Sequence, residues 1–353
     1  MEHADVAVIG AGQSGLAAAH ALSQQRLRPV VLEASGRAAG SWPKYYDSLT
    51  LFSPARYSSL PGMAFPGADP DRYPHRDEVV AYLSAYADRL DADIRTGRRV
   101  TAVRQAGAGF EVEIEGGGRL AARAVVAASG SFTRPHRPAL PGLEGFTGTV
   151  LHAAQYRHPE PFAGQRIVVV GAGNSAVQIA TELARFATVT LAGRNPVKFA
   201  RQRILGRDLH FWLRRTGLDI APLGRLVRTP PTQLVIDDGH YSAALAAGRP
   251  DRRPVFTGAD GARLLWPDGS REKVDSVLLA TGYRAHLPYL TGLEGALDDS
   301  GLPRHAEGIA TRVPGLTFVG LEWQRSLSSN SLRGVGRDAA RIARRLAARL
   351  AGW

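Results

Sequence analysis

The stretch DVAVIGAGQSG, residues 5–15, decides the fold class of this chain. Its apolar half, residues 5–9, is typical of a buried parallel strand, and the glycines that follow predict a tight turn. We expect a helix from about Ser14 to Gln25 and a second strand over Pro29 to Leu32. The stretch therefore opens a βαβ unit.

Three glycines in this turn, Gly10, Gly12 and Gly15, have the spacing of a dinucleotide-binding loop. The first permits a sharp turn, the second lets a pyrophosphate approach the backbone, and the third lets helix and strand pack closely. Gln13 and Ser14 open the helix whose N-terminus then faces the anion. Glu33 ends the second strand, where a carboxylate can accept hydrogen bonds from ribose hydroxyls. A packing turn without a ligand is the alternative.

The same pattern recurs downstream, with a strand over Arg166 to Val170, the turn GAGNSA at 171–176, a helix to about Phe186 and a strand over Thr188 to Ala192. Two such units predict an α/β fold with two Rossmann-like dinucleotide-binding domains. The second site is expected to use the turn and the helix start: Gly171, Gly173, Asn174, Ser175 and Ala176.

The residue that ends each second strand separates the two cofactors. Glu33 and Arg194 each stand 23 residues after the first glycine of their turn, so we expect them at equivalent positions. A carboxylate suits an unphosphorylated ribose, whereas a guanidinium pairs with a 2′-phosphate. The first site therefore fits FAD and the second NADPH, with NADH as the other nucleotide to consider. Lys198 and Arg201 could add charge to the phosphate pocket; an exposed arginine without a ligand is the alternative for Arg194.

Composition excludes several functions. The chain has 353 residues, which favours two domains, and a formal net charge of +12. Its arginines are spread along the chain without a basic tail, so nucleic-acid binding is not expected. There is no cysteine, which excludes disulfides, thiolate metal sites and a C-x-x-C redox pair. We expect no metal and infer that the electron acceptor is a bound cofactor.

No secretory signal and no apolar run of about 20 residues is visible, so we expect a cytoplasmic protein without stable membrane insertion. From Asp338 onward, Ile342, Leu346 and Leu350 recur every four residues. This spacing predicts a surface helix, with a helix lying on a membrane as the alternative.

The remaining segments predict how the two domains are connected. FEVEIE (110–115), GGG and a strand over Arg123 to Ala128 predict a hairpin, and WPDGS (266–270) predicts a turn. Further strands are expected over 277–280 and 316–319. We place the FAD domain at residues 1–157 and 275–353 and the NADPH domain at 158–274. Crossings are expected near 133–142 and 157–164, and residues 200–230, with little regular structure, form a possible cap over the site.

Between the two units, Phe146-x-Gly148-x-x-x-His152-x-x-x-Tyr156 matches the fingerprint F-x-G-x-x-x-H-x-x-x-[YF]. Its position resembles that in the flavin-containing monooxygenases and the related Baeyer–Villiger enzymes. The resemblance covers nearly the whole chain, from Val6 to about Ala347. Three further segments resemble elements of the same family: Gly40-Ser41-Trp42, Ala280-Thr281-Gly282-Tyr283 and Gly334-Val335-Gly336-x-Asp338.

The resemblance implies that NADPH delivers hydride to flavin N5 and that reduced FAD traps dioxygen as a C4a-hydroperoxide. That species oxygenates a small molecule, by preference a thioether or an amine, with Baeyer–Villiger oxidation of a ketone as the second choice. His152 and Tyr156 are expected to fix one domain against the other. Further cofactor contacts are expected from Ser41, Trp42, Val100, Ser129, Gly130, Thr281, Gly282 and Gly334.

One position departs from the family pattern, because Phe52 stands where eukaryotic members carry an asparagine near the flavin. We expect Phe52, Trp323 and Gln324 to line the substrate pocket. An oxidase or quinone reductase that inserts no oxygen remains an alternative, as does a regulatory module that senses nucleotides. The physiological substrate and the choice between a monomer and a homodimer are left open.

Overall fold

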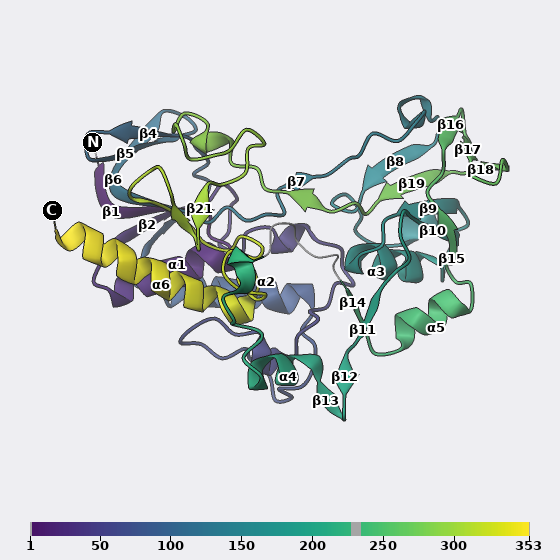
Figure 1. Cartoon of the computed structure of the whole chain (residues 1–353), viewed down its shortest axis with the longest axis horizontal. Coiled ribbons are helices and arrows are strands. Elements are labelled where there is room, and N and C mark those ends of the chain that lie inside the picture. The colour runs from purple at the N-terminus through teal and green to yellow at the C-terminus, as the bar shows by residue number, and fades with distance from the viewer. Residues whose placement is uncertain (1, 227–233, 353) are drawn as a thin grey trace.

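The computed structural model describes residues 2–226 and 234–352. Two parallel sheets lie side by side, and both chain ends lie next to the first of them (Figure 1). Each sheet begins with a strand, a glycine turn and a helix, as the sequence predicts. The structure confirms an α/β fold built from two Rossmann-like units.

The first sheet has five parallel strands in the order β23-β6-β1-β2-β3. Its central strand β1 is buried from Val6 to Ile9, because neighbouring strands and covering elements leave neither face to solvent. The predicted hairpin joins β5 to β6, and two short antiparallel strands extend the opposite edge. The bounds are β1 (Glu2–Ile9), β2 (Pro29–Leu32), β3 (Asp93–Arg95), β4 (Val100–Ala106), β5 (Gly109–Ile114), β6 (Gly118–Ala127), β21 (His305–Ala306), β22 (Ile309–Ala310) and β23 (Leu316–Phe318).

The second sheet is also parallel, with the order β15-β10-β9-β19-β8. A small antiparallel sheet, β16-β17-β18, stands beside it, and the predicted turn 266–270 joins its last two strands. The bounds are β8 (Thr149–His152), β9 (Arg166–Val170), β10 (Thr188–Gly193), β15 (Asp251–Pro254), β16 (Gly258–Asp260), β17 (Arg263–Leu265), β18 (Arg271–Lys273) and β19 (Ser276–Leu279).

The longest helix, α6, starts six residues before the predicted start at Asp338. Gly334 and Gly336 weaken the helix signal in the sequence, yet each is needed for a close contact. A Cβ on Gly334 would lie 2.2 Å from the carbonyl oxygen of Ser328, and one on Gly336 would lie 2.3 Å from Pro61. The helices are α1 (Gln13–Gln24), α2 (Arg76–Asp88), α3 (Asn174–Leu183), α4 (Leu209–Arg215), α5 (His240–Ala246) and α6 (Leu332–Ala351).

The apolar face of α6 is covered by protein. Ile342, Leu346 and Leu350 are buried in one cluster with residues of α1. A helix that lay on a membrane would need this face free. The membrane-lying alternative is therefore wrong for this helix.

Two chain segments cross between the sheets as a short antiparallel ribbon of β7 (Arg134–Pro135) and β20 (Tyr283–Arg284) (Figure 1). Strands β8 and β19 lie beyond this ribbon, in the second sheet, although the boundaries at 157 and 275 place them in the first domain. Strand partners are invisible in sequence, which explains the difference. We propose a division at the β7–β20 ribbon, so that the second domain spans about residues 136–282.

Residues 199–226 leave the second unit and run along the first; we call this segment the strap. It contains β11 (Phe199–Arg201), a tight hairpin of β12 (Arg203–Ile204) and β13 (Arg207–Asp208), and α4; the hairpin and α4 lie at the lower edge of Figure 1. The chain returns as β14 (Val235–Asp237), paired with β11. The strap holds more regular structure than predicted for the cap, whose positions 227–230 lie outside the described residues. Short 3-10 helices occur at Trp42–Lys44, Ala55–Tyr57, Leu143–Gly145, Glu160–Phe162, Leu223–Arg225 and Pro288–Leu290.

The first glycine turn leads to a test of the fold. A Cβ on Gly15 would lie 1.7 Å from the carbonyl oxygen of Gly10, so α1 could not stay against β1. We expect Gly15→Ala to lower the free energy of unfolding by about 3 kcal/mol or more. Gly173→Ala is the matched control, because a Cβ there meets nothing within 4 Å, and should cost less than about 1 kcal/mol. Urea unfolding followed by circular dichroism measures both, and equal losses would contradict the packing argument.

Candidate functional site

The turn between β1 and α1 is shaped to receive an anion. Gly10 adopts a φ of +102°, and a Cβ on it would lie 2.8 Å from the carbonyl oxygen of Ala128, so β6 closes against the turn. Helix α1 starts after Gly12 without a side-chain cap and without an acidic residue in its first turn. Its N-terminal amide groups and the positive end of its dipole therefore remain available to a phosphate.

Glu33 stands at the end of β2, where the sequence places it. It is only 7% exposed, and its carboxylate accepts hydrogen bonds from the amide of Ala11 at 2.7 Å and from the amide and hydroxyl of Ser35, each at 2.8 Å. A carboxylate has about four acceptor positions, so one stays free for a ribose hydroxyl. The amide of Arg98 donates to the carbonyl of Glu33 at 2.7 Å, which brings the start of β4, with Val100, to the same strand end.

A cavity of about 540 Å³ opens beside this strand end. Gly40 lines it, and this residue lies so close to Gly12 that a Cβ on Gly40 would be 2.8 Å from the Cα of Gly12. Arg37 and Lys44 supply positive charge that sequence reasoning missed, although both follow Glu33 within a short loop. The lining residues are Ser35, Gly36, Arg37, Gly40, Pro43, Lys44, Asp77 and Val80. Glycine turn, ribose acceptor and cationic wall together fit the pyrophosphate and adenosine portion of FAD.

The second turn repeats the first. A Cβ on Gly171 would lie 2.4 Å from the carbonyl oxygen of Ala280, as one on Gly10 would meet Ala128. Helix α3 likewise starts after a glycine, Gly173, with no side-chain cap and no acid in its first turn. The strand next to each turn ends in the same way, with Ser129-Gly130 after β6 and Thr281-Gly282 after β19; the two glycines have φ values of +80° and +81°. The chain therefore holds two matching anion-binding turns.

The strand register corrects the predicted equivalence of Glu33 and Arg194. The amide of Gly10 donates to Leu32 at 2.8 Å, and the amide of Gly171 donates to Ala192 at 2.9 Å, so Leu32 and Ala192 correspond. The residue that follows Leu32 is Glu33, but the residue that follows Ala192 is Gly193. Leu32 stands 22 residues after Gly10, but Ala192 stands only 21 residues after Gly171, so equal counts from the glycine do not mark equivalent positions. The place of the carboxylate is thus empty in the second unit, and Arg194 stands one residue beyond it.

Arg194 is exposed at the end of β10 and lies near the crossing ribbon. Burial, the charge of Arg284 and the charge of Arg194 lower the pKa of His136, so these three groups are close to one another. The imidazole of His136 is therefore neutral at neutral pH. The positive charge of this strand end comes from the two arginines. Lys198 is exposed as well.

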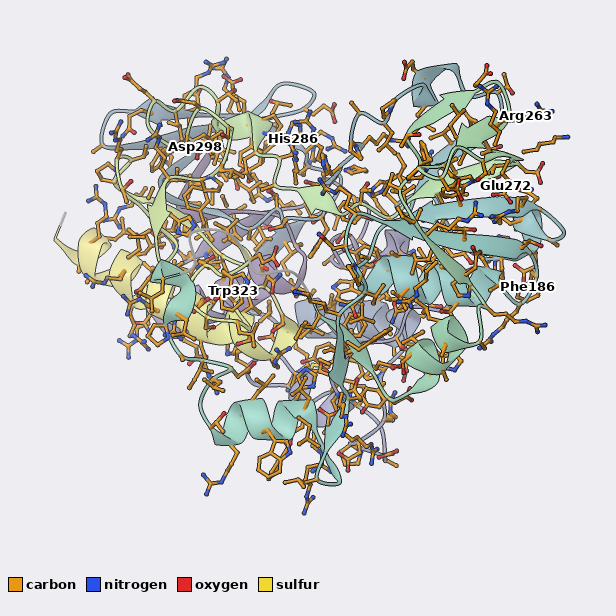
Figure 2. All side chains as sticks on the ribbon, turned by 45° about the vertical axis from the view of Figure 1, so that its right-hand side comes forward. Phe186, Arg263, Glu272, His286, Asp298 and Trp323 are labelled. Carbon is orange, nitrogen blue, oxygen red and sulfur yellow. The ribbon has the colours of Figure 1, made fainter. Side chains whose placement is uncertain are left out.

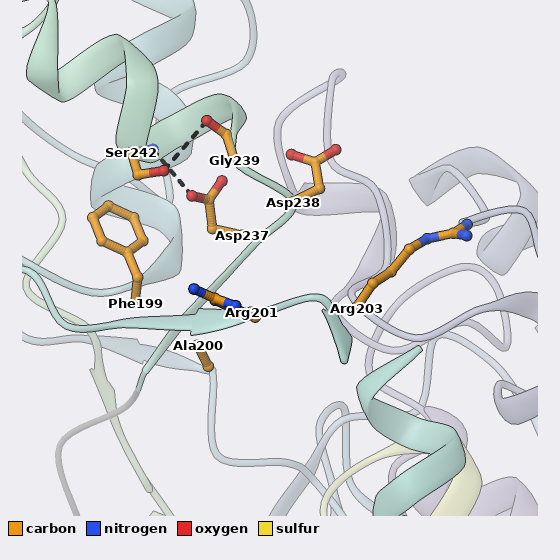
Figure 3. Close-up of a pocket in the computed structure, with 8 residues that line it drawn as sticks. All are labelled: Phe199, Ala200, Arg201, Arg203, Asp237, Asp238, Gly239 and Ser242. Atoms are coloured by element: carbon orange, nitrogen blue, oxygen red, sulfur yellow. Dashed lines mark hydrogen bonds between the residues drawn. The ribbon is translucent and has the colours of Figure 1, made fainter. Parts of the chain in front are cut away.

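Arg201 lies elsewhere, in a separate cavity of about 420 Å³ that Arg194 does not line (Figure 3). Asp237 faces Arg201 across this cavity. Its carboxylate accepts hydrogen bonds from the backbone amides of Tyr241 and Ser242 at 2.9 and 3.1 Å. The structure therefore does not bring Arg201 and Arg194 into one pocket. The lining residues are Phe199, Ala200, Arg201, Arg203, Asp237, Asp238, Gly239 and Ser242.

Side-chain hydrogen bonds join two segments expected to touch the flavin to the chain just before α6. The indole N–H of Trp42 donates to the side-chain oxygen of Gln13 at 2.9 Å. The side-chain nitrogen of Gln13 donates to the backbone carbonyl of Asn330 at 2.6 Å. Ser41 and Tyr45 share a hydrogen bond of 2.9 Å, and burial raises the pKa of Tyr45 to about 12. The loop at 40–45, the start of α1 and the segment before α6 are thus brought together.

The three predicted pocket residues have different surroundings. Phe52 and Trp323 are half-buried, and their carbonyl groups lie against the strap: Gln202 donates to Phe52 at 3.1 Å, and a Cβ on Gly224 would lie 2.2 Å from the carbonyl oxygen of Trp323. Gln324 is only 3% exposed, and its amide nitrogen lies within 2.3 Å of where a Cβ of Gly308 would be. Its side chain therefore points into the interior, which does not support the prediction that it lines the substrate pocket.

The fingerprint segment is built for packing. A Cβ on Gly148 would lie 2.5 Å from the ring of Phe146, so the glycine makes room for the phenyl group. His152 is fully buried: its Nε2 lies 3.1 Å from the carbonyl oxygen of Gly282, and its Nδ1 accepts the amide of Ala154 at 3.0 Å. Tyr156 donates to Glu182 of α3 at 2.7 Å. Both imidazole nitrogens are engaged by backbone, which supports a structural role for His152.

Tyr46 comes from the first unit but packs inside the apolar cluster of the second. It is 4% exposed within the apolar cluster around α3, its ring lies 6.1 Å from that of Tyr156, and its hydroxyl donates to Gln178. Burial raises the pKa of this hydroxyl well above its usual value. The amide of Asp47 donates to the carbonyl of Arg157 at 2.8 Å. The loop that contains Trp42 is therefore anchored to the helix of the second glycine turn.

Two other features are absent from residues 2–226 and 234–352. No group of three or more histidine and acidic side chains there could hold a metal ion. No helix in this part of the chain has the length and apolar character needed to cross a membrane.

Comparison with known proteins extends these observations. A model of the pyridine nucleotide-disulphide oxidoreductase family matches residues 7–215. A CzcO-like oxidoreductase of Geobacillus kaustophilus is 33% identical over 346 residues, which cover 96% of this chain and 97% of that protein. Indole-3-pyruvate monooxygenase YUCCA1 of Oryza sativa subsp. japonica is 32% identical over 390 residues, with 96% and 90% coverage. Because this chain has no cysteine, it has no thiol pair of its own to react with a disulfide.

The structure is similar to that of a flavin-containing monooxygenase from Stenotrophomonas maltophilia. The TM-score is 0.85 at 31% sequence identity, and the match covers 99% of each chain. Two complete units, and the connections between them, are therefore shared along the entire length.

The role of His152 can be tested by pH. Burial lowers its pKa, so below about pH 6.5 the unfolded chain binds the proton more readily and the free energy of unfolding falls as the pH decreases. We expect His152→Asn to be less stable than wild type at neutral pH and to lose part of this acid dependence. Part remains, because burial also lowers the pKa of His20 and His305. The pH profile of flavin reduction by NADPH should not change; loss of an inflection there would instead indicate acid–base catalysis.

Proposed function

Since the chain belongs to the flavin monooxygenases of the pyridine nucleotide-disulphide oxidoreductase family, we propose that it uses NADPH, FAD and dioxygen to oxygenate a thioether or an amine. One oxygen atom would enter the substrate and the other would leave as water. The hydride of NADPH supplies both electrons, and a solvent proton completes the water molecule. The single observation that carries the cofactor assignment is the difference between the two strand ends, Glu33 in one unit and Gly193-Arg194 in the other.

The electrostatics of the two strand ends support this assignment. In the first unit a buried carboxylate with one acceptor position to spare suits the unphosphorylated ribose of FAD and would repel a phosphate. In the second unit Gly193 leaves that place without charge. A 2′-phosphate there would meet the exposed guanidinium of Arg194, with Arg284 nearby.

The anchoring of the loop at 40–47 supports hydride transfer between the two nucleotides. Tyr46 is buried against α3, whose N-terminus would face the NADPH pyrophosphate, while Trp42 is hydrogen-bonded to the first residue of α1. The same loop thus touches both nucleotide helices. This arrangement would hold the nicotinamide and the flavin in a fixed relation, which is how a protein contributes to cofactor chemistry.

Bound FAD would supply hydride acceptance and oxygen activation, so the protein needs no nucleophile of its own. Its side chains bind, orient and exclude water. Tyr45 and Tyr46 have raised pKa values and stay protonated at neutral pH, so they act as hydrogen-bond donors and not as bases. Phe52 gives the pocket an apolar wall in place of an amide, which favours a soft, uncharged reacting group.

Nucleotide choice follows from Arg194. Replacing it with alanine should lower kcat/KM for NADPH by a factor that corresponds to roughly 1.5–3 kcal/mol of activation free energy, the scale of a hydrogen bond to a charged group. The value of kcat/KM for NADH should stay nearly unchanged. Steady-state kinetics with both nucleotides measure this. Equal losses for NADPH and NADH would contradict a contact with the 2′-phosphate.

A matched pair at the neighbouring residue sharpens the same test. Gly193→Glu would place a carboxylate where Glu33 stands in the first unit and should reverse the preference in favour of NADH. Gly193→Ala adds the same Cβ, which would lie 3.1 Å from the carbonyl oxygen of Asn195, without the charge. If the alanine variant changes the preference as much as the glutamate variant, sterics and not charge decide it.

Oxygen insertion is tested by labelling. Under ¹⁸O₂ and NADPH, with a thioether offered as substrate, we expect one molecule of sulfoxide for each NADPH consumed. Each sulfoxide molecule should carry one labelled oxygen atom. A cyclic ketone offered in parallel should give less product, and the reverse ranking would favour Baeyer–Villiger oxidation. Stoichiometric hydrogen peroxide without labelled product would identify an oxidase. Protein that neither copurifies with FAD nor takes it up would contradict the proposal as a whole.

A further inference from the structure

The strap exposes apolar side chains to an unusual degree. Leu205, at the tip of the β12–β13 hairpin, is 86% exposed, and Leu218, just beyond α4, is 52% exposed. The tip projects beyond both sheets at the lower edge of Figure 1. Further exposed apolar residues of the strap are Ile204, Ile220, Leu223 and Leu226. A contiguous segment with so many exposed apolar side chains is characteristic of an interaction surface.

The exposed charges of the described strap residues are all positive. Arg203, Arg207, Arg214 and Arg215 are exposed, whereas the two acidic side chains, Asp208 and Asp219, are turned inward. Asp208 accepts hydrogen bonds from Tyr73, Gln202 and His210 at 2.6–2.8 Å. Asp219 is paired with Arg333 at 2.9 Å. The exposed side chains described for the strap therefore combine apolar groups with cations and include no carboxylate.

This face is held in place by contacts with the first unit. Tyr73 and the carbonyl of Phe52 fasten one end of the strap through Asp208 and Gln202. The hydroxyl of Ser328 donates to the carbonyl of Asp219 at 2.7 Å near the other end. Within the projection, the indole of Trp212 donates to the carbonyl of Ile204 at 2.9 Å and so fixes the hairpin against α4. The apolar tip is thus presented on a rigid support and is not an unfolded loop.

We propose that the strap is a surface for adsorption to a bilayer that contains anionic lipids. The arginines would lie among the headgroups, and Leu205, Ile204 and Leu218 would enter the boundary with the acyl chains. Charge complementarity favours this partner over a second copy of the chain, because a two-fold contact through this face would bring the same arginines together. A nucleic acid would pair with the cations but leave the apolar tip without a partner.

The proposal concerns attachment to the surface and not a spanning segment. Because the strap touches Phe52 and Trp323, adsorption would also place the bilayer next to the candidate substrate pocket. Apolar thioethers or amines dissolved in the membrane would then be close to it. Adsorption itself does not depend on the proposed reaction and is tested without it.

The test is flotation of the full FAD-loaded chain with lipid vesicles. We expect it to float with vesicles of phosphatidylglycerol and phosphatidylcholine at low ionic strength, to be released by salt, and to stay behind with pure phosphatidylcholine. Reversing two charges in Arg214→Glu with Arg215→Glu should weaken binding on the order of 30-fold. Arg252→Glu with Arg263→Glu makes the same change in net charge on the second unit, where Figure 2 labels Arg263, and should leave binding nearly unchanged.

The apolar contribution has its own matched pair. Leu205→Ser should weaken binding to the anionic vesicles about tenfold, whereas Leu302→Ser, which alters a 47% exposed leucine outside the strap, should not. Thermal unfolding and flavin content show that each variant is folded. Failure of the wild type to float, or equal losses in test and control variants, overturns the proposal. So does a dimer in light scattering that Leu205→Ser dissociates, since the face would then be buried between two copies.

Discussion

The contact on which the structure depends is the one between Gly15 and the carbonyl of Gly10. With no side chain at Gly15, α1 can lie directly against the end of β1, and its N-terminus is aimed at the space above the sheet. Everything expected of the first nucleotide site follows from that placement. The amides of α1, the carboxylate of Glu33 and the close meeting of Gly12 with Gly40 all converge on this one edge.

The second unit repeats the plan with one decisive change. Gly171 meets Ala280 as Gly10 meets Ala128, and the turns after β19 and β6 match in conformation. Because the second unit has one residue fewer between its first glycine and this strand end, a glycine occupies the place of the carboxylate and Arg194 follows it. A duplicated scaffold thus offers two strand ends of different charge, a buried carboxylate in one unit and a glycine followed by an arginine in the other.

Side chains that look reactive in sequence serve mainly to connect these two scaffolds. His152 is hydrogen-bonded to the backbone of Ala154 and Gly282, and Tyr156 is hydrogen-bonded to Glu182. Tyr46 is buried against α3. The strap makes a second connection below the sheets, with Asp208 and Asp219 bonded to side chains of the first unit and with exposed arginines. When a cofactor carries the reactive atoms, the protein supplies binding and orientation, and residues that hold two binding units rigidly together serve that purpose.

The sequence by itself determined the two βαβ units, their glycine turns and the family fingerprint, because each rests on short-range patterns: apolar runs for buried strands, glycine where a side chain would clash, and fixed spacing within one segment. Only the tertiary structure decided what depends on partners far apart in the chain. Strand pairing placed β8 and β19 in the second sheet and shifted Arg194 one residue past the position of Glu33. Packing turned Gln324 inward, covered the apolar face of α6 with α1, and left Leu205 exposed on the strap. Sequence spacing carries no information about these choices, since they are fixed by which surfaces meet once the chain has folded.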